Sequence, residues 1–168
     1  MATELDHGAI KERIVEILKA NTDLYDPTNN PGTKVRSIGL GIPDKKEFQK
    51  LPTPYIRVTN DTNLESDKPF GSIISNAQSA SYHIAKYLII CVAQAKDAST
   101  VEGVLDDLHK LIKESLKENV DLRDPDDGSD AKCKVSFPVK TEQLGAGQHH
   151  GNSVDGFAIT LQIEQITT

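Results

Sequence analysis

The stretch SYHIAKYLIICVAQA, residues 81–95, decides the fold because it is typical of one long β-strand. Its apolar side chains occur at both parities: Tyr82, Ile84, Leu88, Ile90 and Val92 on one, and Tyr87, Ile89, Cys91 and Ala93 on the other. Successive side chains of a strand point to opposite faces of the sheet. Apolar residues on both faces toward the end of the stretch therefore predict a central strand that is covered on both sides.

Two amphipathic helices are expected, one directly after this strand and one near the N-terminus. Ser99 and Glu102 have the spacing of a capping box, which predicts that the second helix starts at Ser99 and ends near Asn119. The apolar stripe after this cap is Val101, Val104, Leu105, Leu108, Leu111, Ile112 and Leu116. The first helix is predicted over residues 9–20, where the stripe is Ile10, Ile14, Ile17 and Leu18 and the charged residues lie mostly elsewhere.

Four shorter strands complete the prediction, at residues 34–40, 55–59, 133–139 and 157–163. Polar or Gly-rich chain separates them, and we expect long loops at residues 60–79, 120–131 and 141–153. Neighbouring strands are joined mostly without helices, which favours an antiparallel sheet. The predicted fold class is α+β: one domain over residues 1–168, with a mostly antiparallel sheet and both helices packed on one face.

Composition excludes several classes of protein. There are 19 Lys and Arg against 25 Asp and Glu, and the net charge of −6 argues against a sequence-independent grip on nucleic acid. The N-terminal segment lacks the layout of a signal peptide, and the most apolar run, residues 87–93, is too short to span a bilayer. Cys91 and Cys133 stand among apolar neighbours, which predicts two buried thiols in a reducing compartment; a disulfide or redox pair is the alternative.

No catalytic or metal motif is found. Counting an EF-hand from Asp124 puts Ser129 at the sixth position and Val135 at the twelfth, where calcium loops need Gly and Glu. His149 and His150 lack the spacings of zinc ligands, and the pair Gly39 and Gly41 lacks the rest of a dinucleotide fingerprint. We therefore expect no enzymatic activity and no cofactor or metal.

Several stretches resemble the tail terminator and tail-completion proteins of long-tailed viruses. The resembling stretches are the N-terminal helix, the Pro-flanked LPTPYIRV at 51–58, the long strand YLIICVAQAKD at 87–97 with its following helix, and the terminal DGFAITLQIE at 155–164. The resemblance covers most of the chain and rests on layout more than on an invariant motif.

This resemblance implies a structural virion protein, located at the tail–neck junction and assembled in the host cytoplasm. Such proteins form a homohexameric ring that caps the tail tube and joins the tail to the neck. The implied partners are other copies of the chain, the tail tube protein and a neck or head-completion protein, with DNA only passing through the ring and no membrane. The candidate subunit or tail-tube contacts lie in the predicted loops and are Phe70, Ile73, Gln143, His149 and His150.

Two alternatives stay open at this point. One is a neck or head-completion role in the same particle. The other is a small intracellular ligand-binding or enzymatic domain, with a site in a cleft beside the long strand. Deleting residues 145–151 is expected to impair assembly and leave thermal unfolding nearly unchanged if that loop contacts a partner.

Overall fold

The computed structural model describes residues 5–28, 33–44, 46–47, 53–69 and 81–167. Its elements run α1 (His7–Ala20), β1 (Ser37–Leu40), β2 (Tyr55–Pro69), β3 (Ser81–Ala95), α3 (Ala98–Glu118), β4 (Val135–Gln143), β5 (Gly147–His149) and β6 (Asn152–Thr167). One mixed sheet has the order β1-β2-β3-β6-β4, with β5 also paired to β6. Every pairing is antiparallel except β1 with β2, so the predicted α+β class and mostly antiparallel sheet are confirmed.

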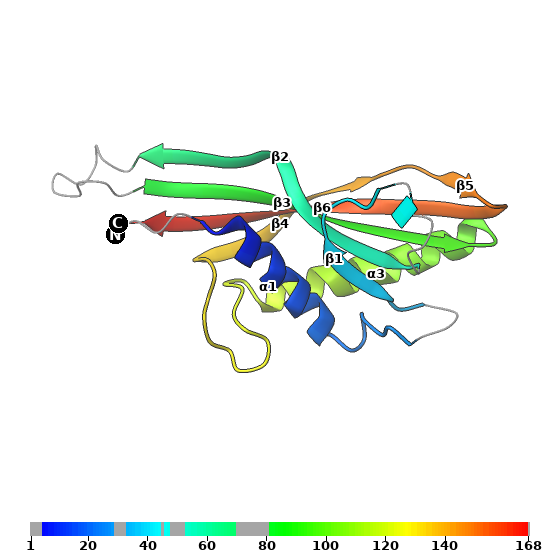
Figure 1. The fold of residues 1–168 in the computed structure, drawn as a ribbon, viewed down its shortest axis with the longest axis horizontal. Helices are drawn as coiled ribbons and strands as arrows, with labels where there is room; N and C mark the ends of the chain where they lie inside the picture. The colour runs from blue at the N-terminus through cyan, green and yellow to red at the C-terminus, as the bar shows by residue number, and fades with distance from the viewer. Residues whose placement is uncertain (1–4, 29–32, 45, 48–52, 70–80, 168) are drawn as a thin grey trace.

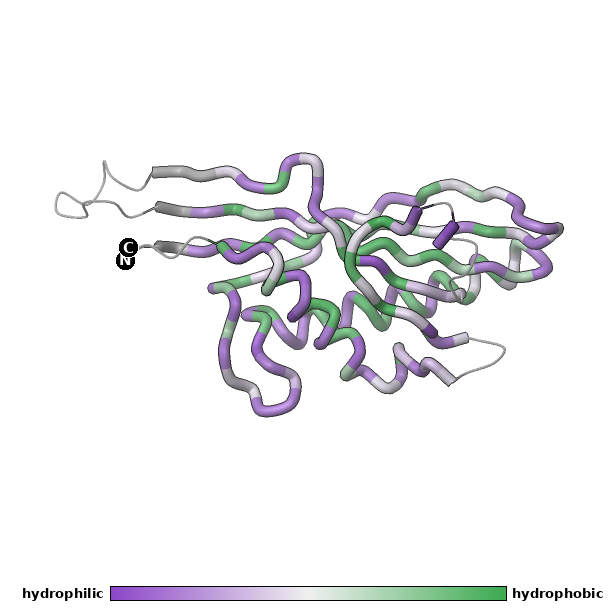
Figure 2. Tube along the Cα trace, viewed as in Figure 1, coloured by the Kyte–Doolittle hydropathy of each residue, from purple (hydrophilic) through white to green (hydrophobic). Residues whose placement is uncertain are grey.

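Both helices lie on one side of the sheet, as predicted (Figure 1). The odd-numbered residues of β3 from Ala85 to Ala93 point toward them and are buried, together with the apolar stripes of α1 and α3. Figure 2 shows hydrophobic residues gathered where the helices meet the sheet. On the other face of β3, Leu88 and Ile90 are only half-buried. The prediction that both faces of the strand are covered is therefore wrong at Leu88 and Ile90, because both helices pack on the opposite face, whereas Val92 near the end of the strand is buried.

The cap of α3 differs from the prediction. Asp97 is the N-cap, and its carboxylate accepts a hydrogen bond from the Thr100 backbone N–H at 2.8 Å. Ser99 lies inside the first turn, and its hydroxyl donates to the same carboxylate. Both residues are good N-cap formers, but the long strand ends at Ala95, and the N-cap lies two residues before the predicted one.

The predicted loop at residues 60–79 is wrong up to Pro69, which is the last residue of β2. The sequence does not predict this part of the strand because its residues are polar and have no apolar period. Its pairing with β3 holds it in place. Residues 70–80, including Phe70 and Ile73, lie outside the described part of the chain.

The predicted loop at 141–153 is also wrong. Strand β4 continues to Gln143, β5 occupies Gly147–His149, and β6 already begins at Asn152. His150 and Gly151, both with positive φ (48° and 78°), form the two-residue turn of a β5–β6 hairpin. The loop predicted at residues 120–131 is confirmed, since these residues form neither helix nor strand.

Candidate functional site

Three strand ends project together from the body and form an extension that we call the arm. The arm consists of residues 65–69 of β2, 81–85 of β3 and 163–167 of β6, which pair in register. Figure 1 shows these strand ends extending past the start of α1, while Ala85 and Ile163 at their base are still packed in the core. Strand β1 pairs with β2 only as far as Val58, and within the described residues no strand covers the outer edge of β2 in the arm.

A large β-bulge separates the arm from the body. Between the pairs Asn60–Tyr87 and Glu65–Ala85, β2 advances five residues while β3 advances two, so three extra residues are accommodated. The Asp61 carboxylate accepts a hydrogen bond from the Thr62 N–H at 2.7 Å, which organises the bulge locally. Bulges of this kind bend a strand and redirect the residues after the bend, so the bulge sets the direction in which the β2 edge leaves the body.

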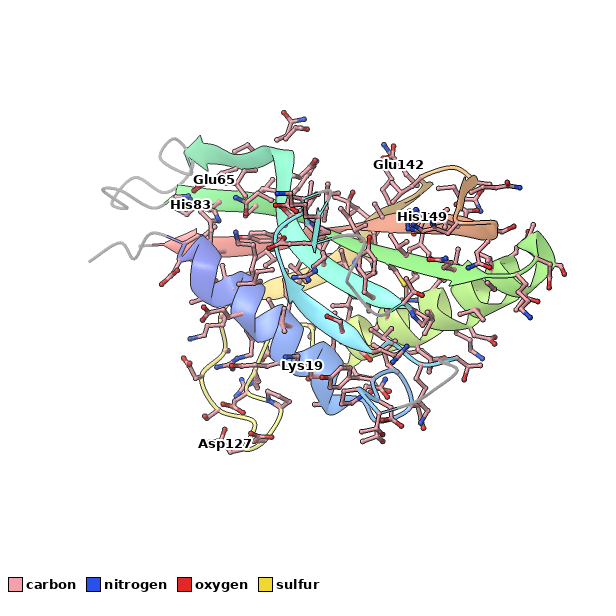
Figure 3. The ribbon with its side chains drawn as sticks, turned by 45° about the vertical axis from the view of Figure 1, so that its right-hand side comes forward. Lys19, Glu65, His83, Asp127, Glu142 and His149 are labelled. Carbon is pink, nitrogen blue, oxygen red and sulfur yellow. The ribbon has the colours of Figure 1, made fainter. Side chains whose placement is uncertain are left out.

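A hydrogen-bonded network joins the arm to the start of α1. His7 Nδ1 lies 2.6 Å from the Tyr87 hydroxyl, and His7 Nε2 lies 3.0 Å from Glu65 Oε2. The other oxygen of Glu65 is 3.7 Å from His83 Nδ1, and Figure 3 shows Glu65 and His83 side by side in the arm. Burial, and then the Glu65 carboxylate, raise the pKa of Tyr87 far above its usual value. The Tyr87 hydroxyl therefore stays protonated and can donate to His7.

The β5–β6 hairpin carries two of the predicted contact residues. His149 is half-buried and His150 exposed, with ring centroids 4.1 Å apart. The Gln94 side chain donates to the His149 carbonyl at 3.4 Å. Gln143 is exposed at the end of β4, opposite Phe157 of β6, whereas His149 is opposite Asn152. These predicted residues therefore lie along one edge of β6 and do not form one cluster.

The acidic loop, which we define as residues 121–130, is held against α1 by a buried arginine. The Arg13 guanidinium donates to the carbonyl of Asp130 at 3.1 Å and to that of Leu122 at 3.4 Å. It also donates to the Asp130 carboxylate at 3.3 Å, while its Nε lies 2.9 Å from Glu16 without hydrogen-bond geometry. Arg13 is 7% exposed and is the exception among the charged residues of α1, which were predicted to lie mostly away from the apolar stripe. The signal was available, since Arg13 lies three residues after Ile10 and four before Ile17 on the same helical face.

Neighbouring hydrogen-bond donors and cations lower the pKa of two carboxylates in the acidic loop. The pKa of Asp127 is lowered by hydrogen bonds from Ser129, and that of Asp130 mainly by the Lys132 ammonium. Asp126 and Asp127 lie at the tip and make no ion pair within the described chain. The loop therefore presents unneutralised negative charge from a fixed position.

A hollow of about 410 Å³ lies at the other end of α3. Its lining includes Arg36, just before β1, and Lys96, just before α3, together with Gln94, Thr53 and Thr100. The Arg36 Nε is buried and has no hydrogen-bond partner among the described residues. Neither cation makes an ion pair with any described residue, so the hollow is suited to a negatively charged group. Nothing in the sequence pattern brings these two residues together.

The two cysteines do not pair, and the described residues do not group as metal ligands. Cys91 and Cys133 are free and buried, and burial raises the pKa of both, that of Cys133 to about 12. The buried thiols are confirmed, and the disulfide alternative is wrong. Within the described ranges, no three His, Cys, Asp or Glu residues are grouped as metal ligands. None of the helices in that part of the chain is both long and apolar enough to cross a bilayer.

Comparisons with family models and with curated proteins found no match. No family model matches the chain, and no curated protein matches it significantly. The functional proposal therefore rests on the arm, the β5–β6 hairpin, the acidic loop and the hollow.

Proposed function

We propose that this chain is a structural virion protein of the tail-terminator kind, which caps the tail tube as a ring and joins the tail to the neck. The observation that carries the proposal is the arm, whose outer β2 edge is not covered by any strand of the described residues. An exposed strand edge presents unpaired N–H and C=O groups, and a second chain can pair with them directly. A ring needs such a contact to repeat from one subunit to the next.

The opposite edge of the sheet supports the same proposal. Strand β4 is the last strand there, but Pro138 cannot donate to a neighbouring chain and a register shift follows between Pro138 and Lys140. These devices blunt an edge against pairing. Along the body this edge thus resists addition of a strand, while no described strand covers the β2 edge of the arm, which favours assembly through the arm over growth along the body.

The network of His7, Glu65 and Tyr87 adds a reason for a preformed arm. It connects Glu65 of the arm to His7 at the start of α1, and His7 also contacts the hydroxyl of the fully buried Tyr87. An arm held in one direction before binding loses less conformational freedom on assembly than a free one. Non-catalytic assembly is therefore the function we propose. The acidic composition is compatible with passage of DNA through the ring.

Electron microscopy with hydrogen exchange tests this proposal. The purified chain should form rings of uniform diameter or cap isolated tail tubes in negative stain. Amides of residues 65–68, in the β2 part of the arm, should exchange more slowly in the assembled state than in the monomer, because their edge gains a partner. Amides of residues 37–40, in the other exposed-edge strand of the body, serve as the internal comparison.

Other outcomes point elsewhere. Binding to purified neck components without capping of tubes would favour the head-completion role. Monomers that ignore tubes, combined with a specific small-molecule shift of the melting temperature, would favour the ligand-binding alternative; a ligand at a hundred times its dissociation constant stabilises by about 2.7 kcal/mol. Rings whose residues 65–68 exchange as fast as in the monomer would remove the arm from the contact.

A further inference from the structure

We propose that the hollow lined by Arg36 and Lys96 receives the acidic loop of a second copy of this chain. The inference rests on the proposed ring and names the side-chain contact that would close it. The hollow holds two cations without ion pairs among the described residues, one of them with a buried, unbonded Nε. The acidic loop contains five Asp and one Arg, a net charge of 1 − 5 = −4. The two surfaces are therefore complementary in charge.

The geometry requires that the loop come from another molecule. The hollow includes Thr100 and Val101 in the first turn of α3, and the acidic loop follows the last turn. The 21 residues of α3 separate the two by about 30 Å at 1.5 Å per residue. Figure 3 shows Asp127 far from the start of α3. Because Arg13 holds the loop against α1, the loop cannot reach the hollow of its own chain.

A contact between two different patches is heterologous, which is the type that generates rings. The loop is prepared for it, since Arg13 and Lys132 engage Asp130 while the carboxylates of Asp126 and Asp127 remain at the tip. At the hollow, the adjacent Asp97 carboxylate is occupied by capping α3 and by the Ser99 and Thr100 hydroxyls. The dipole of α3 adds to the charge of both surfaces: its positive N-terminal end lies at the hollow, and its negative C-terminal end lies next to the acidic loop.

A charge exchange between the two surfaces tests the inference. The hollow variant carries Arg36→Glu and Lys96→Glu, and the loop variant carries Asp126→Lys and Asp127→Lys. Sedimentation velocity over a concentration series should show salt-sensitive association of the wild type. The dissociation constant should rise at least about tenfold in each variant alone, because each brings like charges together. An equal mixture of the two variants should associate again, since both alternating contacts then join opposite charges.

Matched controls carry the same charge changes on exposed positions of α3. Lys110→Glu with Lys117→Glu matches the hollow variant, and Asp106→Lys with Asp107→Lys matches the loop variant; both should associate as the wild type does. The milder pair Arg36→Gln and Lys96→Gln replaces the hollow variant if the Glu substitutions prevent folding. Carbodiimide cross-linking of the wild type should join the Lys96 amine to the carboxylate of Asp126 or Asp127 in a covalent dimer, identified by mass spectrometry.

The results separate this inference from the proposed function. Rings or capped tubes that form equally well with the charge variants would overturn the inference and leave the proposed function standing. A mixture that fails to recover association, or a hollow variant that self-associates normally but no longer caps tubes, would also overturn it; the latter would assign the hollow to the tube protein. A wild type that neither associates nor caps tubes would overturn both.

Discussion

At the scale of single residues, Arg13 is the charge on which a whole loop depends. It lies on the buried face of α1 and donates to two carbonyls and one carboxylate of the acidic loop. Leu122 and Asp130, which it contacts, both have positive φ and need outside support to hold that conformation. Arg13 thus converts an irregular acidic segment into a fixed surface.

Replacing Arg13 should destabilise the fold by about 2–3 kcal/mol. The Arg13→Met substitution keeps the aliphatic bulk but leaves buried carbonyls without a donor. The expected loss of stability is smaller than that for breaking a fully buried ion pair, because the Asp130 carboxylate is largely exposed. Urea unfolding would measure it, with Lys11→Met on the same helix as the matched control at less than about 0.5 kcal/mol. A loss for Arg13→Met no larger than that of the control would contradict this role.

At the scale of elements, the N-cap decides where α3 starts and links its stability to pH. Hydrogen bonds from Thr100 and Ser99 lower the pKa of Asp97 from its ordinary value of 3.8. A carboxylate whose pKa is lowered by folding stabilises the protein above its unfolded-state pKa. That contribution is lost as the pH falls through the lower, folded-state value.

We therefore expect the urea midpoint of Asp97→Ala to lie below that of the wild type by a constant amount above about pH 5. The difference should shrink as the pH falls below 3.8. Ser99→Ala should have a smaller effect that likewise shrinks as the pH falls below 3.8, since its hydroxyl donates to the same carboxylate and helps to lower its pKa. The reverse order, with Ser99→Ala the more damaging, would show that the helix is capped where the sequence pattern predicts.

At the scale of the whole molecule, the β5–β6 hairpin has to be tested by substitution. Deleting residues 145–151 would remove β5 and break its pairing with β6, so a loss of assembly could come from damage to the sheet. Gln143 and His150 are both exposed, and Asn is well suited to the positive φ at position 150.

The pair Gln143→Ser and His150→Asn should weaken capping of tail tubes at least about tenfold if this edge contacts the tube, as for other contact residues at interfaces. The urea midpoint should not change, because neither side chain is buried. Lys110→Ser with Glu114→Ser, on the exposed face of α3, provides the control. Capping at the wild-type level would remove these two residues from the contact surface.

The sequence by itself determined the elements whose pattern is periodic. Both helices and the long strand β3 follow from apolar spacing, because burial of one stripe or face is the main local constraint on a segment. The α+β class then follows from their order. Loop 120–131 and the two buried thiols were likewise predictable, from turn-forming residues in the first case and apolar neighbours in the second.

Only the tertiary structure decided the features that carry the proposals. The polar half of β2 is a strand because β3 supplies its hydrogen bonds, and the Gly-rich segment before β6 becomes a hairpin for the same reason. Arg36 and Lys96 are 60 residues apart in sequence and share a hollow because β1 and α3 begin at the same end of the molecule. Periodicity reports the face that a segment buries, whereas pairing partners and shared surfaces depend on contacts between segments distant in the chain.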